Sequence, residues 1–329
     1  MTFSRRDLCH FPNTWLHKTL ALATLIHMPS KLNSAIFAIA VFAACGSSIA
    51  QTSRGMLQEE GIEPPLEQIL RSQKPDASDP RFVRAYREAI ASSIKREMAT
   101  PGRVDELIVK TYGQMSPVKM KLFARNMQAI LKHEGYYDML VNLTLPMVQA
   151  NIPMAQIKEV MSATVLTIPL KGLPRLNEQD QMAFIAYTAR LMGNVPPEIC
   201  KRITTNDMSA QESAYIERSY LVTRSDEEFT AVADLYLRAI EYELSDFPQV
   251  ANYTDAQLKS AQTIFAKALV KRMQKRMPIE QVSSILNDMK KAPAKEVCVT
   301  SLDIFRTLLD MPSPFRKWQL QVFVNETAR

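Results

Sequence analysis

Residues 225–244, SDEEFTAVADLYLRAIEYEL, carry the pattern that decides the fold class. Ser225 and Glu228 have the spacing of a capping box, in which two side chains bond the free backbone N–H groups at the start of a helix. The apolar residues that follow recur every three or four positions: Phe229, Val232, Ala233, Tyr236, Leu237, Ile240 and Leu244. This spacing predicts an amphipathic helix with one buried face.

The same pattern recurs on both sides of this segment. Thr254 and Gln257 repeat the cap ahead of a second apolar face, made of Leu258, Ala261, Phe265, Ala268 and Leu269. Earlier in the chain, Val83, Tyr86, Ile90 and Ile94 form another. Residues 315–324 fit either a strand or a helix, and a helix is favoured because no other strand is predicted to pair with them. In total the periodicity predicts about ten to twelve helices.

Glycine usage excludes the main β and α/β classes. The chain of 329 residues has 8 glycines, and none follows Gly193. Sandwiches, barrels and dinucleotide-binding folds depend on glycine for tight turns and phosphate loops. We therefore predict an all-α fold, a multi-helix bundle or array in two packed halves.

The predicted organisation has four parts. Residues 1–50 form a cleaved signal peptide, with Met28 as the favoured true start, and residues 51–80 form a flexible tether rich in Pro, Gly and polar residues. The two helical halves are residues 81–167 and 175–329. Between them Pro169, Gly172 and Pro174 predict a long turn or a hinge.

The export signal is an apolar run at residues 35–44, preceded by Lys31 and followed by small residues. Cleavage between Ala50 and Gln51 fits this pattern. The run is about half the ~20 residues that span a bilayer, so no transmembrane span is predicted in the mature protein. The expected location is the periplasm or the outer membrane.

Two other processing routes stay open. Residues 42–45, FAAC, resemble a bacterial lipobox, which would make Cys45 the lipidated first residue of a lipoprotein. Ser4, Arg5 and Arg6 resemble the opening of a twin-arginine signal, although the apolar run lies far downstream.

Few residues in the mature chain could bind a metal or act as a catalytic base. Beyond Ala50, Cys200 and Cys298 are the only cysteines, and in an oxidising compartment they predict one structural disulfide; the alternative is two buried free thiols. His133 is the only histidine, and its place near a helix end predicts a capping role. We therefore predict no metal and no cofactor.

One stretch has the composition of a catalytic motif. Gln211, Glu212, Ser213, Ala214 and Tyr215 resemble the Glu-Ser segment of lytic transglycosylases, exported helical enzymes that cleave glycans. The resemblance implies Glu212 as the acid that protonates a glycosidic oxygen. That family continues with a glycine-rich segment, which this chain lacks beyond Gly193, so a non-enzymatic role is favoured over the enzyme.

Charge and methionine content allow two kinds of binding surface, one basic and one apolar. The net charge is +6, or +3 without residues 1–50, which is too mild for a nucleic-acid partner. Lys259, Lys267, Lys271 and Lys275 share one predicted helix face, which is either a solvated face or a contact for anionic lipid or cell-wall polymer. The chain has 18 methionines, which mostly predict core but also fit a carrier of apolar ligands.

The leading hypothesis is therefore an exported, non-enzymatic helical binding, scaffold or chaperone-like protein of the bacterial cell envelope. Its partner would be an envelope protein or a cell-wall or lipid component. The glycan-cleaving enzyme and the lipid carrier are the alternatives.

Overall fold

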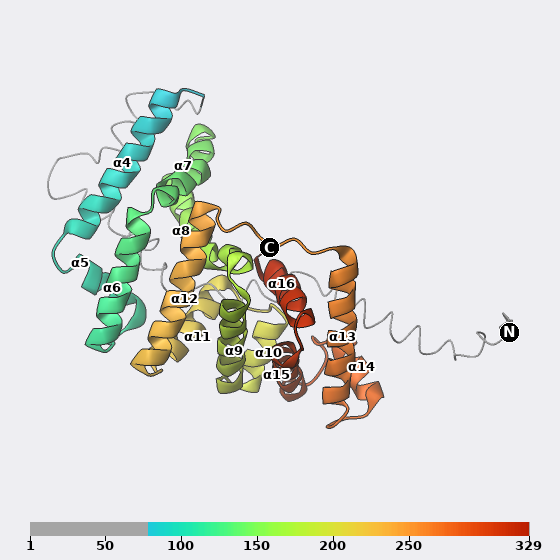
Figure 1. Ribbon diagram of the computed structural model, residues 1–329. Coiled ribbons are helices and arrows are strands. Elements are labelled where there is room, and N and C mark those ends of the chain that lie inside the picture. Colours follow the sequence, from blue (N-terminus) through green and yellow to red (C-terminus); the bar gives the residue numbers. More distant parts are fainter. Residues whose placement is uncertain (1–77, 329) are drawn as a thin grey trace, which may run out of the picture. The chain divides into compact units, whose positions relative to one another are not determined.

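The computed structural model describes residues 78–328, and this part of the chain is all-helical, as predicted (Figure 1). It contains thirteen α-helices, one 3-10 turn and no strand. The elements are α4 (Pro80–Ala99), α5 (Arg103–Tyr112), α6 (Pro117–Lys132), α7 (Glu134–Gln149), α8 (Met154–Gly172), η2 (Leu173–Arg175), α9 (Glu178–Asn194), α10 (Pro197–Thr204), α11 (Ala210–Val222), α12 (Asp226–Ser245), α13 (Asp255–Met273), α14 (Ile279–Asn287), α15 (Ala294–Asp310) and α16 (Phe315–Ala328). No helix within these residues has the length and apolar character that a bilayer crossing requires.

The described residues form two compact units, each of which draws on separate parts of the sequence. The first, here called the α12 unit, contains residues 78–184, 208–251 and 327–328. The second, the α15 unit, contains residues 185–207 and 252–326. The division into halves at residues 81–167 and 175–329 remains a prediction. In the structure, α11 and α12, which belong to the second of these ranges, pack against helices of the first.

Helix α12 is the centre of its unit. It is the helix that residues 225–244 predict, and it packs against α6, α7 and α8. Its inner face is fully buried, with Phe229, Tyr236 and Ile240 each at most 1% exposed. Burying a side chain of this size contributes about 1.5–3 kcal/mol, so this face is a large contribution to the unit's stability.

Helices α7 and α8 meet α12 at two glycines. A Cβ placed on Gly172 would lie 1.8 Å from the carbonyl oxygen of Ala239, and one placed on Gly135 would lie 2.3 Å from that of Leu244. Both contacts are to backbone atoms, which cannot move aside as a flexible side chain could. The absence of a side chain at these positions therefore sets how closely the helices approach.

The α15 unit is built around a helix that contacts both α10 and α13. Cys200 of α10 and Cys298 of α15 form the predicted disulfide, with their Cα atoms 5.5 Å apart. One turn further along both helices, the hydroxyls of Thr204 and Ser301 are hydrogen-bonded at 2.8 Å. The two helices are thus joined by a covalent bond and a buried polar contact.

Helix ends follow the sequence signals closely. Thr254 and Gln257 form the complete capping box of α13. At α12, the Ser225 hydroxyl accepts a hydrogen bond from the Glu228 N–H, as predicted. The Glu227 carboxylate accepts a hydrogen bond from its own backbone N–H and one from the Ser225 hydroxyl, and these two bonds, in that order of size, lower the Glu227 pKa.

Two prolines lie inside helices. The sequence predicts a kink or break at Pro146 and a long turn or hinge over residues 168–177. α7 continues through Pro146 without a break, and α8 continues through Pro169 and ends at Gly172, after which η2 leads to α9 at Glu178. A proline in a helix interior costs about 3 kcal/mol or more. Both helices pack against α12, and that burial offsets the cost.

Candidate functional site

Glu212, the candidate catalytic acid, lies in the first turn of α11. Its carboxylate accepts hydrogen bonds from the backbone N–H of Ser209 at 2.9 Å and from the Ser209 hydroxyl at 3.0 Å. In return, the Ser209 hydroxyl accepts the Glu212 N–H, which completes a capping box. The side chain is exposed, and its carboxylate caps the N-terminus of α11. This capping role explains why a glutamate occupies the position and requires no catalytic function.

Two substitutions separate the capping role from the catalytic one. Glutamine also serves in a capping box, so Glu212→Gln is expected to change the free energy of unfolding by less than about 0.5 kcal/mol. Ser209→Ala removes the hydroxyl and is expected to cost about 1 kcal/mol. Urea unfolding measures both. Loss of a glycan-cleaving activity in Glu212→Gln, with stability unchanged, would instead establish the enzyme.

His133 lies between two helices. It follows α6 directly, as the sequence predicts, but its side chain serves the start of α7: Nδ1 accepts a hydrogen bond from the Gly135 N–H at 3.2 Å. Nε2 lies 3.0 Å from the hydroxyl of Ser245 at the end of α12. Both ring nitrogens are occupied by structural contacts, so the ring joins α7 to α12.

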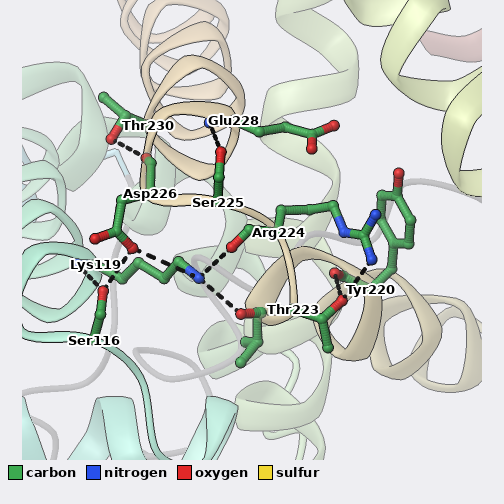
Figure 2. A network of polar contacts seen from close by, with 10 residues as sticks. Ser116, Lys119, Tyr220, Thr223, Arg224, Ser225, Asp226, Glu228 and Thr230 are labelled. Atoms are coloured by element: carbon green, nitrogen blue, oxygen red, sulfur yellow. Dashed lines mark hydrogen bonds and ion pairs between the residues drawn. The ribbon is translucent and has the colours of Figure 1, made fainter.

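The most buried cation of the α12 unit is Lys119, near the start of α6 (Figure 2). Its ammonium donates to the carbonyl oxygens of Val222 at 2.8 Å and Arg224 at 2.6 Å, where α11 ends and α12 begins. Asp226 lies 3.7 Å from the ammonium and also accepts a hydrogen bond from the Ser116 hydroxyl at 2.7 Å. A cation is favoured at helix C-terminal carbonyls, so Lys119 clamps the α11–α12 turn onto α6.

Replacing Lys119 with methionine tests this clamp. Methionine keeps the apolar stem but leaves the two carbonyl oxygens without their donor, and hydrogen bonds that involve a charged group contribute about 1.5–3 kcal/mol. We expect a loss of about 2 kcal/mol in the free energy of unfolding, measured by urea denaturation. Lys121→Met, at an exposed position of the same helix, is the control and is expected to be nearly neutral. Equal effects of the two substitutions would contradict the clamp.

A buried carboxylate was missed by sequence reasoning. Glu217 of α11 is 1% exposed and accepts a hydrogen bond at 2.9 Å from the hydroxyl of Tyr236, which is itself fully buried. The available signal was its position: Ala214, Glu217 and Leu221 fall on one helical face, so the glutamate occupies an inward site. Its observed partner comes from α12, and the contact joins the two helices.

Four lysines that the sequence predicts on one helix face are exposed on and just after α13. Lys259, Lys267 and Lys271 lie on α13, and Lys275 lies in the turn that follows; all four are exposed, and we call them the lysine ridge. None forms an ion pair with another described residue. Asp255, four positions before Lys259, and Glu280 are the nearest acidic residues in the sequence, and none lies between them.

The arginines of the same segment have a different role. Arg272 forms an ion pair with Asp310 at 2.5 Å, and Arg276 forms one with Asp303. Both aspartates lie on α15. Asp303 is only 4% exposed. The basic residues of this segment thus divide into arginines that pair with α15 and exposed lysines that form no ion pair within residues 78–328.

The processing sites predicted at Cys45, Ala50 and Gln51 lie outside the described residues. Six methionines, including Met127 and Met192, are buried in the core. Among residues 78–328, no three His, Cys, Asp or Glu side chains are grouped in a way that could hold a metal ion. Of the side chains predicted as binding or catalytic, the four lysines of the ridge are the ones brought together on one surface.

Comparison with known proteins adds no relative from which a function could be transferred. No protein family, no curated protein and no solved structure matches this chain.

Proposed function

We propose that the chain is an exported, non-enzymatic binding or scaffold protein of the bacterial cell envelope, and that it holds an anionic envelope component on the lysine ridge. The observation that carries the proposal is the division of cations on α13. Arg272 and Arg276 are paired with α15, whereas none of the four ridge lysines forms an ion pair with a described residue.

The row of lysines also has an energetic cost in the free protein. Lys267 and Lys271 lie four residues apart on α13, and like charges at this spacing destabilise a helix by about 0.2–0.5 kcal/mol per pair. Lys275 follows at the same interval in the turn after the helix. They lie closer together than the Debye length of about 8–10 Å at physiological salt, so they act jointly on a nearby polyanion. An anionic ligand would reduce the repulsion between the lysines and would itself be attracted to them.

Chromatography on immobilised dextran sulfate tests the proposal. The ridge variant changes Lys259, Lys267, Lys271 and Lys275 to glutamine. The matched variant changes four exposed lysines elsewhere, Lys121, Lys132, Lys171 and Lys317, and therefore removes the same charge. We expect the ridge variant to elute at clearly lower NaCl than both the wild type and the matched variant. Equal elution of the two variants would show that retention reflects net charge alone and would refute the proposal.

A further inference from the structure

We infer that the anionic component is the phosphate-bearing surface of a lipid bilayer, which the ridge contacts peripherally and without insertion. This inference rests on the proposed function and names its partner. It is drawn from three properties of α13: the type of cation, the shape of the surface, and the absence of an exposed apolar anchor on the helix.

The type of cation fits a diffuse array of charges. Arginine binds carboxylates and phosphates through a rigid, two-pronged contact, whereas lysine is a point charge on a flexible stem. In this segment both arginines have carboxylate partners on α15, and the outward positions are lysines. Flexible point charges are suited to headgroups that move laterally, for which fixed bidentate geometry has no advantage.

The shape of the surface fits a flat partner. Lys259 and Lys271 are twelve residues apart on one continuous helix, which corresponds to about 18 Å along its axis. The outer residues between them, Thr263 and Ala268, are exposed and small, so the lysine side chains extend beyond them. At 3.6 residues per turn, these two lysines differ by about 120° around the axis, so the ridge winds over the convex outer side of the helix. Long, flexible lysine stems on either flank of this side can reach one plane that touches it.

No exposed apolar anchor lies on α13. Phe265, Leu269 and Met273 face the interior of the α15 unit, and the exposed large apolar side chains of the described residues all lie on other elements. Helices that insert into the interface bury an apolar face among the acyl chains, and the stable core of a protein interface is rich in aromatic residues. The apolar face of α13 is already occupied, so the remaining contact is electrostatic.

Cosedimentation with vesicles tests the inference. We compare vesicles of phosphatidylglycerol and phosphatidylcholine, mixed at about 30:70, with pure phosphatidylcholine vesicles at low and high NaCl. One lysine near an anionic surface increases partitioning about fivefold, so the ridge variant is expected to lose more than about a hundredfold. The matched variant is expected to stay within about fivefold of the wild type. High NaCl should release the wild type. Cooperative thermal unfolding of both variants, at a temperature no lower than that of the wild type, confirms that they are folded.

The outcomes separate the two proposals. Ridge-dependent retention on dextran sulfate without binding to anionic vesicles would overturn the bilayer inference, leave the proposed function standing, and indicate a soluble or cell-wall polyanion. Equal binding to pure phosphatidylcholine, or binding that resists high NaCl, would also overturn the inference. Loss of ridge dependence in both experiments would overturn both proposals.

Discussion

Gly172→Ala is expected to destabilise the α12 unit by about 3 kcal/mol, the upper part of the range for overpacked positions. The new methyl group would lie 1.8 Å from the Ala239 carbonyl oxygen and 2.5 Å from its carbon, so α8 and α12 would have to move apart. Their separation would loosen the face on which Tyr236 and Ile240 are buried. Urea denaturation followed by circular dichroism measures the loss.

Gly193→Ala is the matched control for this prediction. Gly193 also lies in a helix, α9, but its added Cβ would meet only the Leu302 side chain, at 3.9 Å. Alanine is a better helix former than glycine by about 1 kcal/mol, so this variant is expected to be neutral or slightly stabilised. If the two alanine variants unfold at the same urea concentration, the close approach of α8 to α12 is not what stabilises the unit.

Loss of the Cys200–Cys298 disulfide is expected to have the largest effect in the α15 unit. The bond links residues 98 positions apart, and the chain-entropy relation gives about 4–5 kcal/mol for a loop of this length. Both cysteines are buried, at 0% and 8% exposed, so replacing both with alanine removes the bond without exposing a thiol. The measurement is urea unfolding of the wild type and the double variant, each with and without dithiothreitol.

Reductant provides the internal control for the disulfide. Dithiothreitol is expected to shift the unfolding of the wild type to lower urea and to leave the Cys200→Ala/Cys298→Ala variant unchanged. A wild type that unfolds at the same urea concentration with and without reductant would show that the bond does not stabilise the unit.

The sequence predicted those features that depend on local pattern. The apolar period of residues 225–244 predicted α12, and the Thr254–Gln257 spacing predicted the cap of α13, because both are set within a few turns of one helix. The disulfide was predictable for a different reason: with two cysteines beyond the expected leader, only one intramolecular pairing exists.

Features that depend on packing between distant segments could not be predicted. Lys119 meets carbonyl groups more than 100 positions away, and nothing in the sequence around it indicates that α11 ends there. Gly172 was interpreted as part of a turn or hinge, whereas the structure uses it for contact with the backbone of α12. The lysine ridge was predicted as a helix face, but which cations of this segment pair with α15 depends on how α13 packs, and the local sequence does not indicate that the two arginines do so.

The most direct test of the account is the intact mass of the protein recovered from cells that express it, measured with and without reductant. We predict a chain that begins at Gln51 and gains the mass of two hydrogens on reduction, as an exported protein with the Cys200–Cys298 bond would. A chain that begins at Cys45 and carries acyl groups would still indicate export, but of a lipoprotein tethered to a membrane and not of a free protein. An uncut chain that begins at Met1 or Met28 would contradict the proposed place in the cell envelope.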